Sequence, residues 1–440
     1  MIALGILLGA SGCVAPSGGA TLTATGTTAR AAAAVFAPTV TLVPSPTTGA
    51  SLMIAAAQTS PPAVPTALST ATPAPSPTAT PAPTRVPPTP SPGVTVVPAV
   101  SVATRDVLRE FAANFATGQG SGVAASADGK YWTLVKQVDG RYAARGELLS
   151  ETRRPGWTFD NVVLSWTATA PAGSGLAFAV RVQAGSDWSG WYTLGTWGGG
   201  VGGSVRGQSD AWGKVDVDTL VLARPARAYQ YRVTFESSDG AVTPALRGVA
   251  VALADMSRPP VGPTMNVAAG WQRELATPVE SQLLQDPSVA WRICSPTSLT
   301  MALRFLGAPV TVPQVYRGVK DVTTGIYGNW PLNTAFAAQL GFDAYVSRMY
   351  SLDQVRGQIA AGLPVPISIK YAAGELHGAA LASTSGHLVL VGGFTADGKV
   401  ILNDPAAPDL ASVRRLVSAE QLERVWLRSG GIAYMVGPQQ

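Results

Sequence analysis

The stretch CSPTSL at residues 294–299 has the pattern of the start of a buried helix, and its first residue is a cysteine. Leu299 and Leu303 fall on one helical face, which predicts a helix that packs against a core. Further helices are expected at residues 312–317, 333–340 and 352–361. Pro296 stands in the first turn, where proline is tolerated. The pattern places Cys294 at a helix N-terminus, where the positive end of the helix dipole lowers a thiol pKa from about 8.5 toward neutrality. Such a cysteine is a candidate nucleophile.

A hairpin pattern follows later in the chain and contains one of its two histidines. His387 begins the strand-like run 387–394, and an Asp-Gly turn connects this run to residues 400–405. In an antiparallel pair, residues equidistant from the turn face one another, so His387 and Asp404 can approach at the same end of the hairpin. The other histidine, His377, lacks a strand context and is the reserve base. The spacing therefore allows a Cys-His-Asp arrangement.

Each of the three residues also has a purely structural interpretation. A cysteine such as Cys294 is often a small core residue, and a histidine such as His387 can be a core residue with its hydrogen bonds satisfied. Asp404 precedes a proline, which is a common way to begin a turn. Their order and context together favour catalysis, because acyl transfer requires a base-activated thiolate and a group that orients the base.

Four parts of the C-terminal sequence resemble the papain-like cysteine peptidases related to the bacteriocin-leader-processing, or double-glycine, peptidases, the C39-like family. They are Gln282, CSPTS at 294–298, GHLV at 386–389 and NDPA at 403–406. The segments 328–333 and 430–434 also resemble recurring parts of a secreted branch of that family. The likeness covers about residues 279–438 and implies an α+β papain-like cysteine peptidase domain over residues 275–440.

The resemblance implies a role for each matching residue. Cys294 attacks the carbonyl carbon of a peptide bond to give a thioester acyl-enzyme, His387 takes and returns the proton, and Asp404 orients the imidazole. Gln282 supplies a side-chain amide to the oxyanion hole together with the Cys294 backbone N–H, and Gln285 competes for this role. The implied substrate is a peptide or protein, and no metal or organic cofactor is needed.

The chain departs from the leader-processing members in two features of this site. Ser295 follows the nucleophile where those enzymes carry Gly, and Gln282 lies twelve residues before the cysteine rather than closer. Cleavage after a double glycine therefore does not follow. A peptidoglycan amidase or endopeptidase and a transglutaminase-like acyl transferase on the same scaffold stay open. Outside the enzymes, a non-catalytic surface lipoprotein that binds carbohydrate is the alternative.

The N-terminal part of the sequence indicates export. Residues 1–13 are apolar and end in small residues before Cys13, which resembles a bacterial lipoprotein signal and implies lipidation of that cysteine. Residues 14–104 are built of Pro, Ala, Thr and Ser, which predicts a disordered tether. We therefore expect an extracytoplasmic protein at the cell surface, either lipid-anchored to the bacterial membrane or secreted. A fragment of an ordinary secretory signal, or a short anchor, is the alternative.

Residues 105–258 alternate apolar and polar side chains with a period of two, which predicts an antiparallel β-sandwich. Seven of the eleven tryptophans lie here, and we expect them mainly in the core. Exposed tryptophans would instead line a cell-wall polysaccharide groove, because aromatic faces stack on the apolar faces of sugars. The section also loosely resembles galactose-binding-like jelly rolls. The expected strands include residues 161–168, 176–183, 220–223, 229–236 and 249–253.

The charge pattern argues against nucleic acid as a partner. Charged residues make up 13% of the chain, and the net charge of +5 is spread rather than clustered. The expected fold is therefore multidomain, with a tether, a β-sandwich and a peptidase domain.

Overall fold

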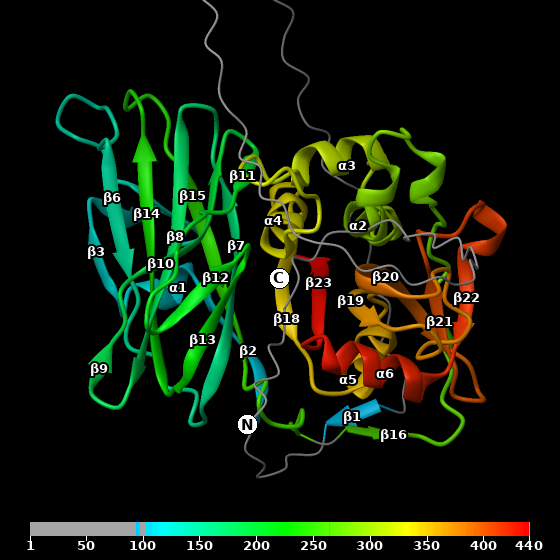
Figure 1. The fold of residues 1–440 in the computed structure, drawn as a ribbon. Coiled ribbons are helices and arrows are strands. Elements are labelled where there is room, and N and C mark those ends of the chain that lie inside the picture. The colour runs from blue at the N-terminus through cyan, green and yellow to red at the C-terminus, as the bar shows by residue number, and fades with distance from the viewer. Residues whose placement is uncertain (1–93, 97–102, 264, 440) are drawn as a thin grey trace, which may run out of the picture. The chain divides into compact units, whose positions relative to one another are not determined.

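The computed structural model describes residues 94–96, 103–263 and 265–439, in which antiparallel strands predominate and helices are few (Figure 1). The expected signal at 1–13, including Cys13, and nearly all of the expected tether at 14–104 lie outside these residues. Val94–Val96 form β1, which pairs with β16 (Met265–Val267), so a disordered tether up to residue 104 does not hold for these three residues. Within the described residues, no helix is long and apolar enough to cross a membrane.

The N-terminal domain, residues 105–254, consists of two antiparallel sheets with seven strands each in the described chain. One sheet has the order β11-β10-β8-β14-β6-β3, with β9 beside β8, and the other has the order β12-β13-β7-β15-β5-β4, with β2 beside β15. The bounds are β2 Arg105–Phe111, α1 Ala112–Phe115, β3 Gln119–Ser121, β4 Val123–Ala125, β5 Trp132–Leu134, β6 Arg145–Leu149, β7 Phe159–Thr169, β8 Ser174–Ala184, β9 Asp187–Trp188, β10 Tyr192–Gly198, β11 Val201–Gly203, β12 Gly213–Asp216, β13 Thr219–Ala226, β14 Ala228–Ser237 and β15 Ala245–Ala254.

Side chains from the inward faces of these two sheets share one hydrophobic core. Trp166 of β7 and Phe178 of β8 stack across it with ring centroids 4.0 Å apart. The expectation that tryptophans fill the core is confirmed for four of them, Trp132, Trp157, Trp166 and Trp197. The other three, Trp188, Trp191 and Trp212, are half-buried beneath arginine guanidinium groups.

The C-terminal domain, residues 273–438, has a single antiparallel sheet of seven strands within the described chain. Its order is β18-β23-β19-β20-β21-β22, and β17 pairs with β20. The bounds are β17 Arg273–Glu274, α2 Cys294–Phe305, α3 Val312–Val319, α4 Trp330–Gln339, β18 Phe342–Arg348, α5 Leu352–Ala360, β19 Val365–Tyr371, β20 Thr384–Phe394, β21 Val400–Asn403, β22 Arg414–Val417, α6 Ala419–Arg428 and β23 Ile432–Pro438, with short 3-10 helices at Gln282–Leu284, Ala290–Arg292 and Leu410–Ser412.

Helices cover both faces of this sheet. Successive side chains of a strand point to opposite faces, so one strand can pack against both helical layers. Leu388 and Tyr434 pack with α2, α3 and α4. Their chain neighbours Val389 and Ala433 pack with α5 and α6. The sheet is therefore buried between two helical layers, and α2 lies directly on β20.

Most helix starts agree with the sequence pattern. Helix α2 begins at Cys294, and α5 at Leu352, as expected. Helix α4 begins at Trp330, three residues earlier than expected, because the Asn329 side chain accepts the Leu332 N–H at 3.3 Å and caps the helix. An earlier start gives α4 an extra turn, which reaches the N-terminal domain.

The two domains share a buried interface around α4. Leu332 and Ala335 of α4 belong to the core of the N-terminal domain, whereas Trp330 and Ala337 belong to the core of the C-terminal domain. Beside α4, the Val346 N–H of β18 donates to Ser165 Oγ of β7 at 3.0 Å. Neither domain therefore has a complete core on its own side of this interface.

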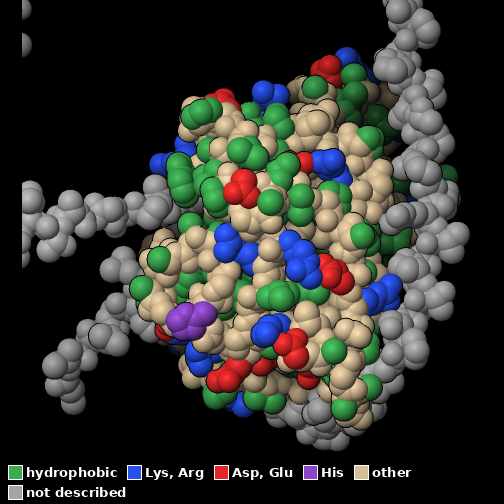
Figure 2. Space-filling view, turned by 90° about the vertical axis from the view of Figure 1, so that its right-hand side faces the viewer, with side chains coloured by type: hydrophobic (Ala, Val, Ile, Leu, Met, Phe, Trp, Pro, Cys, Tyr) green, Lys and Arg blue, Asp and Glu red, His purple; other side chains and the backbone are tan. Residues whose placement is uncertain are grey.

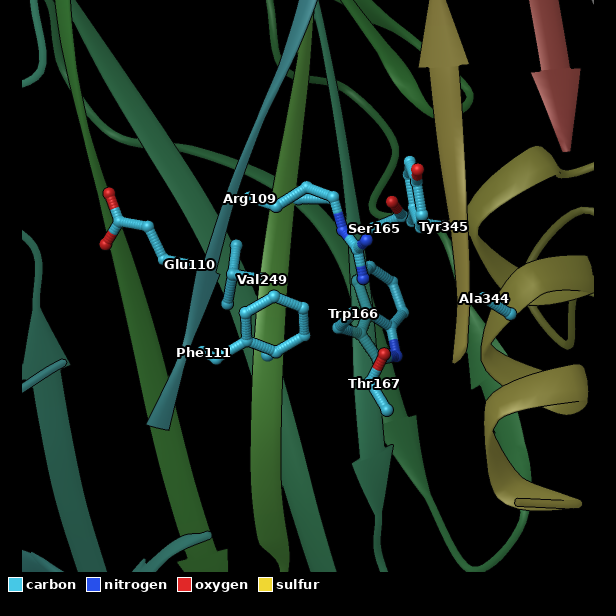
Figure 3. Close-up of a pocket in the computed structure, with 11 residues that line it drawn as sticks. Arg109, Glu110, Phe111, Ser165, Trp166, Thr167, Val249, Ala344 and Tyr345 are labelled. Carbon is cyan, nitrogen blue, oxygen red and sulfur yellow. The ribbon is translucent and has the colours of Figure 1, made fainter. Parts of the chain in front are cut away.

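A cavity of about 10 Å³ lies at the same interface, between β2, β7 and β15 of one domain and β18 of the other (Figure 3). Arg109 stacks on the Tyr345 ring at 3.9 Å and pairs with Asp343 at 2.5 Å. A void of this size holds about one water molecule. The interface is therefore close-packed, and it leaves no room for a ligand at this point.

Candidate active site

His387 and Asp404 form a buried pair in the C-terminal domain. His387 Nε2 lies 2.8 Å from Asp404 Oδ1, and the side chains are 1% and 0% exposed. His387 lies within β20, which begins three residues earlier than the sequence pattern indicated, and Asp404 directly follows β21. The structure therefore contains the contact that the hairpin spacing allowed.

Backbone groups hold the Asp404 carboxylate in place. Its Oδ2 accepts the Ala380 N–H at 2.9 Å, and its Oδ1 accepts the Ala406 N–H at 3.0 Å. Burial by itself would raise the pKa of this carboxyl, but the charge and hydrogen bond of His387 and these two N–H groups outweigh it, so the pKa is below the ordinary 3.8. Asp404 is therefore an ionised acceptor at neutral pH.

An ionised Asp404 decides which nitrogen of His387 carries the proton. A carboxylate only accepts hydrogen bonds, so the neutral imidazole donates to it through Nε2–H. Nδ1 is then the ring nitrogen with a lone pair. His387 can therefore act as a base through Nδ1.

The start of α2 lies beside the strand that carries His387. Ser298 Oγ, one turn after Cys294, donates to the Leu388 carbonyl at 3.0 Å. Cys294 is 2% exposed and belongs to the same buried cluster as Leu388. The fold therefore brings the candidate nucleophile, at the first position of α2, to the part of β20 that holds the candidate base.

Gln282 lies in the segment before α2 and is hydrogen-bonded both to the segment beside Asp404 and to the segment before Cys294. The Gln282 N–H donates to the Pro405 carbonyl at 2.8 Å, next to Asp404. Its side-chain Nε2 donates to the Ala290 carbonyl at 2.7 Å, four residues before Cys294. Its Oε1 is buried with no hydrogen-bond partner among the described residues. Gln282 is thus a buried amide between the ends of the candidate triad.

The competing glutamine has a different environment. Gln285 is half-buried, and its Nε2 donates to the Ser281 carbonyl at 3.3 Å. Gln282 is 1% exposed and is held by shorter hydrogen bonds on its backbone and its side chain. The geometry therefore favours Gln282 over Gln285 as the glutamine of this site.

Ser295 is buried in a polar cluster behind the candidate nucleophile. Its Oγ donates to Asn333 Oδ1 at 2.9 Å, and it lies 2.8 Å from the Tyr434 hydroxyl. Because the single Ser295 proton goes to Asn333, Tyr434 is the donor in the second bond. The two segments that resembled recurring family parts, 328–333 and 430–434, thus meet at Ser295.

The reserve base lies apart from this pair. His377 is exposed on the loop between β19 and β20, and its backbone N–H donates to Gln421 Oε1 at 3.0 Å. In the described residues its ring takes no part in the hydrogen bonds around Asp404. His377 is thus poorly placed to replace His387.

Comparison with known families agrees with this geometry. Residues 274–434 match the model of the Peptidase_C39 like family. This part of the chain is a C39-like peptidase domain. Residues 108–254 match a second model, described as the peptidase C39 N-terminal domain, so both described domains carry C39 signatures. The resemblance of the C-terminal sequence to the C39-like family is confirmed.

Two solved structures are similar to part of this chain. One is a C39-like peptidase from Bacillus anthracis, with 20% identity over 39% of this chain and 99% of that chain and a TM-score of 0.31. The other is a double glycine motif protease from an AMS/PCAT transporter in complex with its leader peptide, with 20% identity over 38% of this chain and 94% of that chain and a TM-score of 0.27. The comparison with curated proteins found no match.

The sequence did not predict the polar groups that hold Asp404 and Ser295 in place. The Ala380 N–H carries no side-chain signal, and Asn333 was expected only as the start of a helix. The signal available for Asn333 was its place in the segment 328–333, which resembled a family part. The cluster could not be assigned without the tertiary structure.

Proposed function

We propose that this chain is a cysteine peptidase whose C39-like domain hydrolyses peptide bonds. The observation that supports it most is the buried contact of 2.8 Å between His387 and the ionised Asp404, at the strand on which the start of α2 packs. A buried imidazole oriented by a carboxylate beside a cysteine at a helix start is an arrangement for nucleophilic acyl transfer.

The first half of the reaction forms the acyl-enzyme. The Cys294 thiol gives its proton to His387 Nδ1, and the sulfur attacks the carbonyl carbon of the scissile bond. The oxyanion accepts hydrogen bonds from the Cys294 N–H and from the second N–H of Gln282 Nε2, whose first N–H is held by the Ala290 carbonyl. Collapse of the intermediate breaks the C–N bond, and the imidazolium protonates the leaving amine.

The second half releases the acyl group. Water attacks the thioester carbonyl while His387 Nδ1 takes its proton, and the proton then returns to the Cys294 sulfur as the carboxylic acid leaves. Asp404 stays ionised throughout and stabilises the imidazolium that forms in each half.

The test is hydrolysis of a fluorogenic peptide library by the full chain in the presence of a reductant, so that Cys294 is a thiol. C294A and H387A should each lose nearly all activity. H377A is the matched control, because it removes the other histidine and should retain full activity. Equal activity in wild type and C294A would refute the proposal. Repeating the assay with an added amine separates hydrolysis from acyl transfer, because a transferase would join the acyl group to that amine and form a new amide instead of a carboxylic acid.

For the place of action we propose an extracytoplasmic, lipid-anchored protein, supported by the small residues before Cys13. When the chain is expressed in a lipoprotein-processing bacterium, it should incorporate labelled palmitate and partition with membranes. C13S should do neither, and labelling that persists in C13S would refute the anchor.

A further inference from the structure

Asp218 of the N-terminal domain contacts the helix that supports the candidate active site. It lies in the turn between β12 and β13 and is 4% exposed. Its Oδ2 accepts the backbone N–H of Trp330, the first residue of α4, at 2.8 Å. An acceptor with negative charge is favourable at this position, because the first N–H groups of a helix lack intrahelical partners and carry partial positive charge.

The turn that carries Asp218 is strained. Asp216 and Thr219 pair across it, which leaves Val217 and Asp218 as a two-residue loop. Val217 has φ of 56° and is the one non-glycine residue with positive φ among the described residues. A β-branched side chain is disfavoured there, and hairpin turns commonly place glycine at this position. The packing around the turn therefore maintains a costly conformation that points Asp218 at α4.

Helix α4 passes this contact on to the start of α2. Asn333, one turn after Trp330, accepts the Ser295 hydroxyl proton at 2.9 Å. The Asn333 amide also donates to the carbonyls of Tyr327 and Asn329 at 2.9 and 2.8 Å, which fixes its orientation. Ser295 is the residue after Cys294, so a shift of the first turn of α4 moves the backbone of the candidate nucleophile.

We propose that Asp218 is a positioning residue for the peptidase reaction: by accepting the Trp330 N–H it fixes the N-terminal turn of α4, which through Asn333 and Ser295 sets the position of Cys294. This inference rests on the function proposed above. It makes the N-terminal domain a part of the catalytic scaffold, because the acceptor, Asp218, belongs to that domain and lies more than 70 positions before the nucleophile in the chain.

The experiment compares D218N with D216N in the full chain. Asn at 218 keeps an oxygen that can accept the Trp330 N–H but lacks the negative charge with which the ionised carboxylate strengthens this bond, so the variants are compared at pH 8, above the carboxyl pKa of about 7. Asp216 lies in the same turn and its substitution removes the same charge, but none of its hydrogen bonds in the described structure reaches α4. D218A removes the acceptor altogether. The buried Trp330 N–H is then left without this acceptor, which destabilises the fold in its own right, so the conclusion relies on D218N.

Two readouts are measured with Cys294 reduced. The first is kcat and KM on the best peptide, and the second is the rate of Cys294 alkylation by iodoacetamide across pH 4 to 9. We expect D218N to lower kcat about fivefold with KM unchanged and to move the alkylation profile to higher pH. D216N should match wild type. In an S295A background, D218N should have no further effect on kcat, because the connection is already broken.

The outcomes separate this inference from the proposed function. If D218N changes only the unfolding temperature, with kcat and the alkylation profile as in wild type, Asp218 is not a positioning residue. If D218N and S295A lower kcat additively, the route through Ser295 is refuted. If wild type hydrolyses no peptide but D218N still shifts the alkylation profile, positioning stands and the peptidase proposal fails.

Discussion

His387 Nε2 and Asp404 Oδ1 lie 2.8 Å apart although the two residues are not opposite each other in the sheet. The ladder between β20 and β21 pairs Leu390 with Asn403 and contains an irregularity between Val391 and Gly393. Asp404 is therefore diagonal to His387, two positions off the directly opposite residue. The hairpin brings the pair to one end, and the loop after β21 turns the carboxylate toward the ring.

The hydrogen bonds of Asp404 predict that D404N is not a mild substitution. The carboxylate accepts from His387, Ala380 and Ala406, whereas an asparagine has one oxygen and an NH2 group that would face an N–H donor. We expect the free energy of unfolding to fall by about 1–3 kcal/mol and kcat to fall at least tenfold. Chemical denaturation and peptide hydrolysis measure these. Wild-type stability in D404N would contradict the assigned hydrogen bonds.

Ser295 should be more than a spacer after the nucleophile. S295A leaves the Asn333 carbonyl oxygen and the Tyr434 hydroxyl buried without this partner, so we expect a loss of about 1–3 kcal/mol of stability. Y434F removes a hydroxyl whose partner in the described part of the chain is Ser295, and it leaves no buried acceptor of Asn333 unpaired, so its cost should be smaller, about 1 kcal/mol. Denaturant unfolding of both variants and of the double variant measures the coupling. Strict additivity would show that the two side chains do not interact.

Asp218 should make stability depend on pH in an unusual direction. Burial raises its pKa from 3.8 to about 7, with a small further rise from Asp216, against the lowering effects of the Trp330 N–H, Thr219 and Arg348. A raised pKa means that the folded state keeps the proton longer than the unfolded chain. The stabilisation from this group is thus complete below about pH 4 and is lost as the pH rises to about 7.

D218N measures this contribution, because an amide does not titrate. The difference in unfolding free energy between wild type and D218N should change by about 4 kcal/mol at most between pH 4 and 8, since one pKa unit corresponds to about 1.4 kcal/mol. The wild type becomes relatively less stable at the higher pH. A difference that is constant across this range would show that Asp218 is not buried as described.

Gly202 of β11 should be essential for the contact between the domains. A Cβ at this position would overlap with Leu332 of α4 and with Trp197 and Thr196 of β10. We expect G202A to lower the free energy of unfolding by about 1–3 kcal/mol, as overpacking does in other cores. Gly190 is the matched control, because it is exposed with open space around its Cα and its φ is not in the left-handed region. Thermal unfolding compares G202A with G190A, and equal midpoints would contradict the packing.

On the face drawn in Figure 2, basic and acidic side chains are interspersed among hydrophobic and polar ones, with no large area of one sign. This agrees with the spread of charge along the sequence. Long-range electrostatics on this face therefore offers little to steer a highly charged partner.

Much of the fold could be predicted from the sequence because periodicity is a local property. The strands around residues 161–168 and 229–236 and the start of α2 at Cys294 agree with their patterns. The early start of α4 at Trp330 was missed, because it depends on Asn329 as a cap and on burial between two domains. Local pattern cannot report burial of that kind.

The sequence by itself determined which residues are the candidate nucleophile, the candidate base and the carboxylate that orients the base. The chain has two cysteines and two histidines, and Cys294 begins a helix pattern while His387 begins a strand pattern. Only the tertiary structure decided that His387 and Asp404 touch, that Gln282 is buried between the ends of the site, and that α4 joins the two domains. The physical reason is range. Propensity and capping act within a few residues, whereas these contacts join segments far apart in the chain, and their geometry is set by packing in a shared core.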